Sequence, residues 1–281
     1  MTRIAYVNGE MIPLDQATIS IQDRGFLFGD GIYEVTAVVG GRLVDYHNHA
    51  ARLTRSLNAI ALPSPVSVER LLQLHHDIIA ANALDEGLIY LQITRGSAER
   101  DFGFPAQTHA SLVMFTQPKA VLDNPWAKTG IKVVTTPDLR WKRCDIKSVS
   151  LLAQVIAKQE AAKLGAQEAW MVRSGKITEG SASSAYIIKN DEIITKPLSN
   201  AILPGVTRMA LLELARSHKL KLIQRAFTLA EAYAADEAFI TAATNFVMPV
   251  VAIDDRPIGS GKPGPHTNAL RKAYIAFALA G

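Results

Sequence analysis

The spacing of apolar residues in the first part of the chain switches between the period of a strand and the period of a helix. Apolar runs flank 8–9 (Asn-Gly) and 40–41 (Gly-Gly), and these dipeptides predict hairpins because they readily adopt the positive φ angles of tight turns. Residues 47–62 carry apolar side chains at helical spacing, and 67–84 repeats this pattern with Ser67 as the predicted N-cap. This part of the chain therefore combines strands and helices.

The later part of the chain alternates in the same way. Strands are predicted at 131–137, 168–180, 184–195, 221–227, 237–245 and 247–253, with turns at 174–175 and 190–191. Helices are predicted at 148–165, at 203–220, from a capping box at 228–231 and from residue 267 onward. The pattern predicts a mixed α and β protein.

The segment 117–130 contains two prolines and has no hydrophobic periodicity. Prolines without a periodic pattern are typical of connecting segments. We therefore predict two domains, a smaller one at 1–122 and a larger one at 123–281.

Composition narrows the classes of function. The 281 residues are 48% hydrophobic and 20% charged, as in ordinary globular proteins. The net charge is +4, but the lysines and arginines are dispersed and no zinc-ligand spacing is present, which argues against nucleic acid as a partner. Cys144 is the only cysteine, so no disulfide can form within the chain. The polar N-terminus lacks the apolar core of a signal peptide, and no run approaches the ~20 apolar residues of a membrane span, so we expect a cytoplasmic protein without a membrane partner.

Two common binding patterns are weak in this chain. The Gly-Asp-Gly at 29–31 lacks the third glycine of a dinucleotide fingerprint, where Glu34 stands, and it leads into a predicted strand instead of a helix. His47 and His49 flank a helix start without a carboxylate at matching spacing, so we predict no metal site.

The turn at 203–205 (Leu-Pro-Gly) runs directly into a predicted helix. The free backbone N–H groups of Val206 and Thr207 then point outward, an arrangement that binds phosphate. Every helix has such an end, however, and most ends bind only water.

Lys147 and Glu179 are the other candidates. Lys147 closes a basic stretch, 140–148, and has apolar neighbours; burial would depress its pKa and make the amine nucleophilic. Glu179 is followed by small residues that would let a flat group approach the backbone. An ordinary solvated lysine and an ordinary surface turn would give the same patterns.

Four motifs, taken in order and spacing, are more specific than any one of them. These are DRGFxFGDGIYEV (23–35), RWxRCDIKS (140–148), TEGSxSS (178–184) and LPGVTR (203–208). Together they resemble the fold-type IV pyridoxal-phosphate enzymes, most closely the D-amino-acid aminotransferases, over about residues 3–255. The resemblance implies a smaller N-terminal α/β domain and a larger, β-barrel-like C-terminal domain with helices, which carries the cofactor lysine.

The resemblance also implies how pyridoxal 5′-phosphate would be held. Lys147 would bond the cofactor through a Schiff base and later shuttle the substrate α-proton. Glu179 would pair with the pyridine nitrogen, while Arg52 and the N–H groups of Val206 and Thr207 would bind the phosphate.

On the substrate side, the resemblance implies that Tyr33 lines the ring and that Arg100 binds the substrate carboxylate. Arg100 would reach in from the partner subunit of a homodimer. The family places a histidine two residues after this arginine, whereas Phe102 stands here. We expect a weakened or reshaped carboxylate trap.

The implied activity is ping-pong transamination between a D-amino acid, of the D-alanine or D-glutamate type, and a 2-oxo acid such as pyruvate or 2-oxoglutarate. The shared cofactor motifs leave other fold-type IV activities open: branched-chain L-aminotransferase, (R)-amine transaminase and aminodeoxychorismate lyase. A non-catalytic protein that binds pyridoxal phosphate is the alternative from another class.

Overall fold

The computed structural model describes residues 2–217 and 220–280, so positions 218–219 of the predicted helix 203–220 lie outside the described residues. The chain divides into two compact units, which are described separately. The first runs to Ala120 and includes Ile146–Ser150; the second comprises Val121–Asp145 and Leu151–Ala280. Lys147 therefore groups with the first unit, whereas the sequence assigned it to the larger C-terminal domain. The domain boundary at 122/123 stays a prediction.

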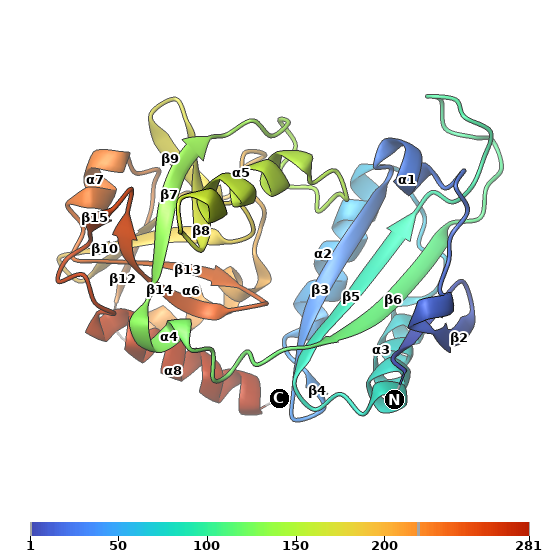
Figure 1. The fold of residues 1–281 in the computed structure, drawn as a ribbon, viewed down its shortest axis with the longest axis horizontal. Helices are drawn as coiled ribbons and strands as arrows, with labels where there is room; N and C mark the ends of the chain where they lie inside the picture. The colour runs from blue at the N-terminus through green and yellow to red at the C-terminus, as the bar shows by residue number, and fades with distance from the viewer. Residues whose placement is uncertain (1, 218–219, 281) are drawn as a thin grey trace. The chain divides into compact units, whose positions relative to one another are not determined.

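The first unit contains a six-stranded antiparallel sheet in the order β2-β1-β6-β5-β3-β4 (Figure 1). Its strands are β1 (Ile4–Val7), β2 (Glu10–Pro13), β3 (Gly31–Val39), β4 (Arg42–Leu43), β5 (Gly87–Thr94) and β6 (Ser111–Pro118). Val7 pairs with Glu10 and Val39 with Arg42, which confirms both predicted two-residue turns.

Two longer helices pack against this sheet. The helical elements of the first unit are η1 (Leu14–Gln16), α1 (Arg24–Phe28), α2 (Tyr46–Ala59) and α3 (Val68–Asn82). α2 packs on β3 and α3 packs on β1 and β6. The Ser67 hydroxyl accepts a hydrogen bond from the Arg70 N–H at 3.2 Å, so the predicted cap is confirmed.

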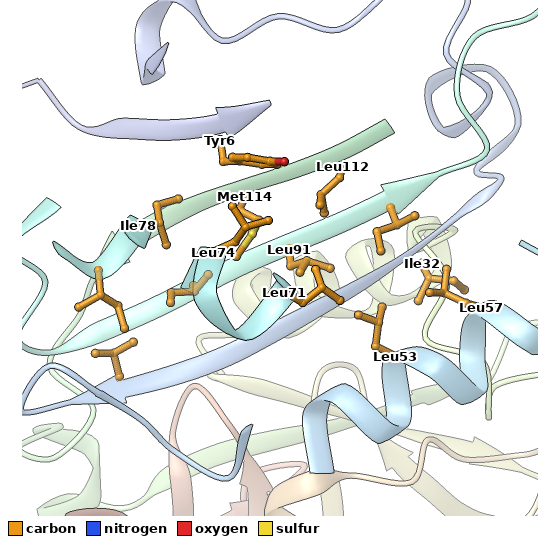
Figure 2. Packing of buried hydrophobic residues seen from close by; sticks show 14 of the residues in the cluster. Tyr6, Ile32, Leu53, Leu57, Leu71, Leu74, Ile78, Leu91, Leu112 and Met114 are labelled. Atoms are coloured by element: carbon orange, nitrogen blue, oxygen red, sulfur yellow. The ribbon is translucent and has the colours of Figure 1, made fainter. Parts of the chain in front are cut away.

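The core of the first unit lies between these helices and the sheet, as Figure 2 shows. The helices contribute Leu53, Leu57, Leu71, Leu74 and Ile78, and the strands contribute Tyr6, Ile32, Leu91, Leu112 and Met114. Burying each aliphatic side chain is worth roughly 1.5–3 kcal/mol, so this cluster fixes the helices on the sheet.

The second unit contains a nine-stranded sheet in the order β12-β11-β10-β13-β14-β7-β8-β9, with β15 paired to β14 (Figure 1). The pairs β11–β12, β14–β7 and β7–β8 are parallel and the others antiparallel, and the sheet curves into a half-barrel. The strands are β7 (Ile131–Pro137), β8 (Glu168–Arg173), β9 (Lys176–Gly180), β10 (Ser184–Lys189), β11 (Glu192–Thr195), β12 (Lys221–Gln224), β13 (Glu237–Ala242), β14 (Phe246–Ile253) and β15 (Arg256–Pro257). The predicted mixed α and β fold is confirmed.

Helices cover parts of this sheet. They are α4 (Trp126–Thr129), α5 (Leu152–Lys163), α6 (Val206–Ser217), α7 (Leu229–Tyr233) and α8 (Pro265–Ala280). α5 packs on β7 and β8, while α6 and α8 pack on each other and on β13. The capping box at Thr228 and Glu231 is present as predicted. Among the described residues, no helix is long and apolar enough to cross a membrane.

The segment Ile146–Ser150 adds to the start of β3 in the first unit. The Tyr33 N–H donates to the Lys147 carbonyl at 3.1 Å, and the Val149 N–H donates to the Gly31 carbonyl at 3.0 Å. Ile146 enters the core cluster of this unit. Backbone pairing and core packing therefore fix the position of Lys147 along β3.

Candidate active site

Lys147 lies beside Tyr33 in the first unit. Its Nζ is 4.1 Å from the centroid of the Tyr33 ring, and its backbone N–H donates to the Ser56 hydroxyl at 3.3 Å. The structure thus brings together two residues that the sequence assigned to the site. The lysine is half-buried instead of buried, and Leu152, one of the apolar neighbours that suggested burial, is itself exposed.

The Tyr33 ring is itself held by stacking. Its centroid lies 5.6 Å from that of Tyr90, which stacks on Phe115 at 4.9 Å. A cation over an aromatic face gains roughly 0.5–2 kcal/mol. This row of rings therefore gives the Lys147 amine a fixed, weakly attractive surface.

Arg52 is buried on α2 and is bound to Glu34 of β3. Its Nε donates to Glu34 Oε1 at 2.8 Å and its terminal nitrogen donates to Oε2 at 2.7 Å, a bidentate pair. His49 Nδ1 lies 2.8 Å from the same Oε2. Burial alone would raise the pKa of the Glu34 carboxyl, but Arg52 and His49 hold that pKa well below its usual range. Burial lowers the pKa of His49, so its ring is neutral at pH 7.

The sequence identified Arg52 but missed both of its partners. His49 and Arg52 are three residues apart and so share one helix face, while Glu34 lies two residues from the buried Ile32 on the same side of β3. These spacings were available signals. The pairing between helix and strand could not be predicted from spacing, because it joins residues 18 apart in the chain.

Arg100 is exposed on the loop that follows β5. Its guanidinium lies over the rings of Phe28 and Phe102, at 5.3 Å and 5.6 Å from the centroids. Phe102 is itself 79% exposed. The loop thus presents a cation beside two apolar rings, an arrangement that can bind a carboxylate joined to a small apolar group.

Asp30 anchors this loop through two arginines. It accepts from Arg24 Nε at 2.9 Å and from Arg95 Nε at 2.8 Å. Arg24 then donates to the Asp101 carbonyl at 2.6 Å, and Arg95 stacks on Phe104 at 3.6 Å from its centroid. The buried pair of arginines therefore holds the loop just after Arg100, at Asp101 and Phe104.

Glu179 is buried near the end of β9 in the second unit. Its Oε1 accepts from Arg140 and from the Leu203 N–H, the latter at 3.0 Å. The same N–H also donates to Oε2 at 3.2 Å, as the longer branch of a bifurcated hydrogen bond. Burial raises the pKa of Glu179 to about 7, and Arg140 opposes that rise.

Arg140 is the partner that sequence reasoning left without a role. Its Nε donates to Asp138 Oδ1 at 2.9 Å, and its terminal nitrogens donate to Asp138, Glu179 and the Ala201 carbonyl. The Asp-x-Arg spacing after a predicted strand was the available signal. The link to Glu179 spans 39 residues, and no local pattern shows it.

The start of α6 is tied to Glu179 through Leu203. The Met209 N–H donates to the Gly205 carbonyl at 3.1 Å. Val206 and Thr207 are the first two residues of α6, so their N–H groups have no acceptor within the helix. A Cβ on Gly205 would lie 2.9 Å from the Ser184 hydroxyl oxygen, so glycine permits this close approach. The predicted anion donors thus directly follow the loop whose Leu203 N–H binds Glu179.

Comparisons with known proteins agree over nearly the whole chain. Residues 31–253 match the family described as Amino-transferase class IV. The chain is 39% identical over 275 residues to D-alanine aminotransferase of Staphylococcus aureus (strain MSSA476), covering 97% of this chain and 96% of the relative. It is 38% identical over 266 residues to D-alanine aminotransferase of Bacillus licheniformis, covering 95% and 94%.

Solved structures share the fold. The Escherichia coli branched-chain amino acid aminotransferase superposes with a TM-score of 0.93 at 22% identity, covering 99% of this chain and 95% of that one. The branched-chain aminotransferase of Thermoproteus uzoniensis, solved with norvaline, gives 0.87 at 24% identity, covering 100% and 96%. At this identity the likeness concerns the fold alone.

Proposed function

Since the chain belongs to the class IV aminotransferase family, we propose that it transfers an amino group between a D-amino acid of the D-alanine type and a 2-oxo acid. The observation that carries this proposal is the identity of 39% to a D-alanine aminotransferase over 97% of the chain. The branched-chain names belong to structures that are 22% and 24% identical, and such a likeness does not extend to the substrate.

Pyridoxal 5′-phosphate, the cofactor of this family, supplies an aldehyde that bonds amines and a ring that accepts electron density from the substrate α-carbon. The residues present fit this group. Lys147 provides an amine beside an aromatic ring, and Oε2 of Glu179 is an acceptor that, among the described residues, receives only the Leu203 N–H at 3.2 Å. The N–H groups of Val206 and Thr207 are suited to a phosphate.

The roles of individual residues follow from these contacts. Lys147 would hold the cofactor and carry the substrate α-proton on Nζ. Glu179, in its anionic form, would pair with the pyridine nitrogen. Arg52 would bind the phosphate while keeping its bond to Glu34, since a guanidinium has five N–H donors. Tyr33 would orient the Lys147 amine.

Arg100 would bind the substrate carboxylate. With Phe102 in place of the family histidine, the trap has one donor fewer and one apolar ring more. We therefore expect D-alanine to be favoured over D-glutamate, whose second carboxylate finds an apolar neighbour, and over an (R)-amine without a carboxylate.

The test is a substrate panel of D-alanine, D-glutamate, L-leucine and an (R)-amine, each with pyruvate and with 2-oxoglutarate. Conversion of the bound cofactor to its amino form by D-alanine supports the proposal, and a higher kcat/KM for L-leucine or the (R)-amine contradicts it. Lys147→Ala should abolish turnover. Lys142→Ala is the matched control, since Lys142 is exposed in the same segment and should keep full activity.

We further propose a cytoplasmic homodimer in which Arg100 serves the partner subunit, supported by its exposure on a loop. Mixing Lys147→Ala and Arg100→Ala chains tests this arrangement. Random pairing would restore about a quarter of the active sites if each site combines Lys147 of one subunit with Arg100 of the other. No recovery in a confirmed mixed dimer would contradict the shared site.

A further inference from the structure

The side chain of Arg140 is buried in the second unit, in the stretch that follows β7. The exposed fraction of its side chain is 5%, against 7% for Glu179 and 0% for Asp138. A guanidinium gives up much hydration when it is buried, and only specific partners offset that loss. Its place is therefore set by the groups it contacts.

The donors of Arg140 are divided between two carboxylates. Nε and one terminal nitrogen bind Asp138 at 2.9 Å and 3.0 Å, and the other terminal nitrogen binds Glu179 Oε1. Asp138 is fixed in turn by the Thr178 hydroxyl at 2.9 Å, and Thr178 directly precedes Glu179 on β9. The guanidinium is thus linked to β9 twice, directly at Glu179 and through Asp138 at Thr178.

The two oxygens of Glu179 have different surroundings. Oε1 receives Arg140 and the shorter arm of the Leu203 N–H, at 3.0 Å. Among the residues that the structure describes, Oε2 accepts only the longer branch of the hydrogen bond from the Leu203 N–H, at 3.2 Å. Arg140 therefore occupies one oxygen and turns the other toward a further donor.

We propose that Arg140 is a positioning residue that orients the Glu179 carboxylate and favours its ionised form, leaving Oε2 for the pyridine nitrogen of the cofactor. This inference rests on the proposed function, because only a pyridine-containing cofactor uses Oε2 in this way. An anionic Glu179 stabilises a protonated ring nitrogen, and a neutral carboxyl would not.

The charges around Glu179 explain why Arg140 is needed. Asp138 and Glu179 are the acidic groups, and Arg140 and Arg173 are the basic ones; Arg173 lies 3.1 Å from Asp138 and is 33% exposed. Burial raises the pKa of the nearby Cys144 thiol, so it stays neutral. Without Arg140, two buried carboxylates would share one half-solvated cation, and Glu179 would take up a proton.

The experiment compares Arg140→Gln with Lys142→Gln, an exposed cation two residues away. Arg140→Lys keeps the charge but loses the fork that spans two carboxylates. Protein labelled with ¹³C at glutamate side-chain carboxyls is titrated as the full chain, with and without pyridoxal 5′-phosphate. Glu179→Gln assigns the signal, and kcat, KM and cofactor Kd are measured on the same samples.

We expect Arg140→Gln to raise the Glu179 titration midpoint by about one pH unit or more. The kcat for D-alanine should fall about 10–100-fold, as for the loss of a hydrogen bond to a charged group, with a cofactor Kd within about threefold of wild type. Arg140→Lys should recover part of the kcat. A midpoint and kcat equal to those of Lys142→Gln would overturn the proposal, as would a loss confined to cofactor binding.

Arg140→Gln leaves the buried Asp138 side chain with Thr178 and Arg173 as its side-chain partners, so the variant can fail to fold. The double variant Asp138→Asn/Arg140→Gln removes both charges of the pair and so leaves no buried carboxylate without its cation at position 138. In this variant the titration midpoint of Glu179 should still rise. The carboxyl titration needs no substrate. If wild type does not react with D-alanine but the midpoint shifts as expected, the proposed substrate is wrong and the role of Arg140 stands.

Discussion

Glu34→Gln should destabilise the first unit by about 3–5 kcal/mol at pH 7. The substitution keeps the shape of the side chain but removes the anion that faces two donors of Arg52 and the ring of His49. The amide of Gln offers one acceptor oxygen and turns an NH₂ toward the remaining donors. A buried guanidinium without its counter-ion costs about this much, because it cannot regain water.

The assay separates the two units. All three tryptophans, Trp126, Trp141 and Trp170, belong to the second unit, so urea unfolding followed by tryptophan fluorescence reports that unit. Hydrogen exchange of peptides from β3 and β5, followed by mass spectrometry, reports the first. A loss of 3–5 kcal/mol should accelerate exchange by about two to almost four orders of magnitude. Glu10→Gln, an exposed change in the same sheet, is the control.

The pH dependence of the stability of the first unit provides a second test of the Glu34–Arg52 pair. The folded-state pKa of Glu34 is depressed, so its contribution to stability is complete above the unfolded value near 4.3 and is lost as pH falls toward the folded value. Wild type should therefore lose stability in the first unit below about pH 4.3, and Glu34→Gln should show a flatter profile there. Exchange rates in Glu34→Gln that match those of Glu10→Gln at pH 7 would refute the reasoning.

Three further predictions concern other residues. Glu179→Gln should lower kcat at least tenfold more than cofactor occupancy, measured by turnover and by absorbance of the bound cofactor; a loss of occupancy alone would reduce Glu179 to an anchor. Phe102→His should lower the KM for D-alanine about tenfold by adding a donor worth about 1.5 kcal/mol, and an unchanged KM would separate this position from the substrate. Thr228→Ala should remove the capping box of α7 and cost about 1 kcal/mol, seen as a fall of about 2–4 °C in Tm, which Ser260→Ala, in an exposed turn of the same unit, should not show.

Local chemistry explains which parts of the fold could be predicted. The turns at 8–9 and 190–191 need positive φ, and Asn, Gly and Asp supply it, so the hairpins follow from short stretches of sequence. The cap at Ser67 is equally local. By contrast, α1 has five residues between Asp23 and Gly29, which is too short for a periodic signal.

Long-range pairing could not be predicted in the same way. The parallel contact between β7 and β14 joins segments more than a hundred residues apart, and the alternation of side chains does not specify a neighbour. The site divides similarly. The order and spacing of the four motifs predicted Lys147 and Glu179 as site residues. Arg140 could be recognised only in the structure, because its role is defined by the carboxylate that it contacts.

The short excursion of Ile146–Ser150 into the first unit has a consequence for how the protein is made. A ribosome that has released residues 1–120 has supplied the sheet and its helices, but the edge of β3 still lacks the partner that binds Tyr33 and Gly31. The first unit can reach its final form only after residue 150 has left the exit tunnel. A chain cut at 120 should therefore remain less protected along β3 than the same residues in the whole protein, and a separate peptide covering 144–152 should restore part of that protection.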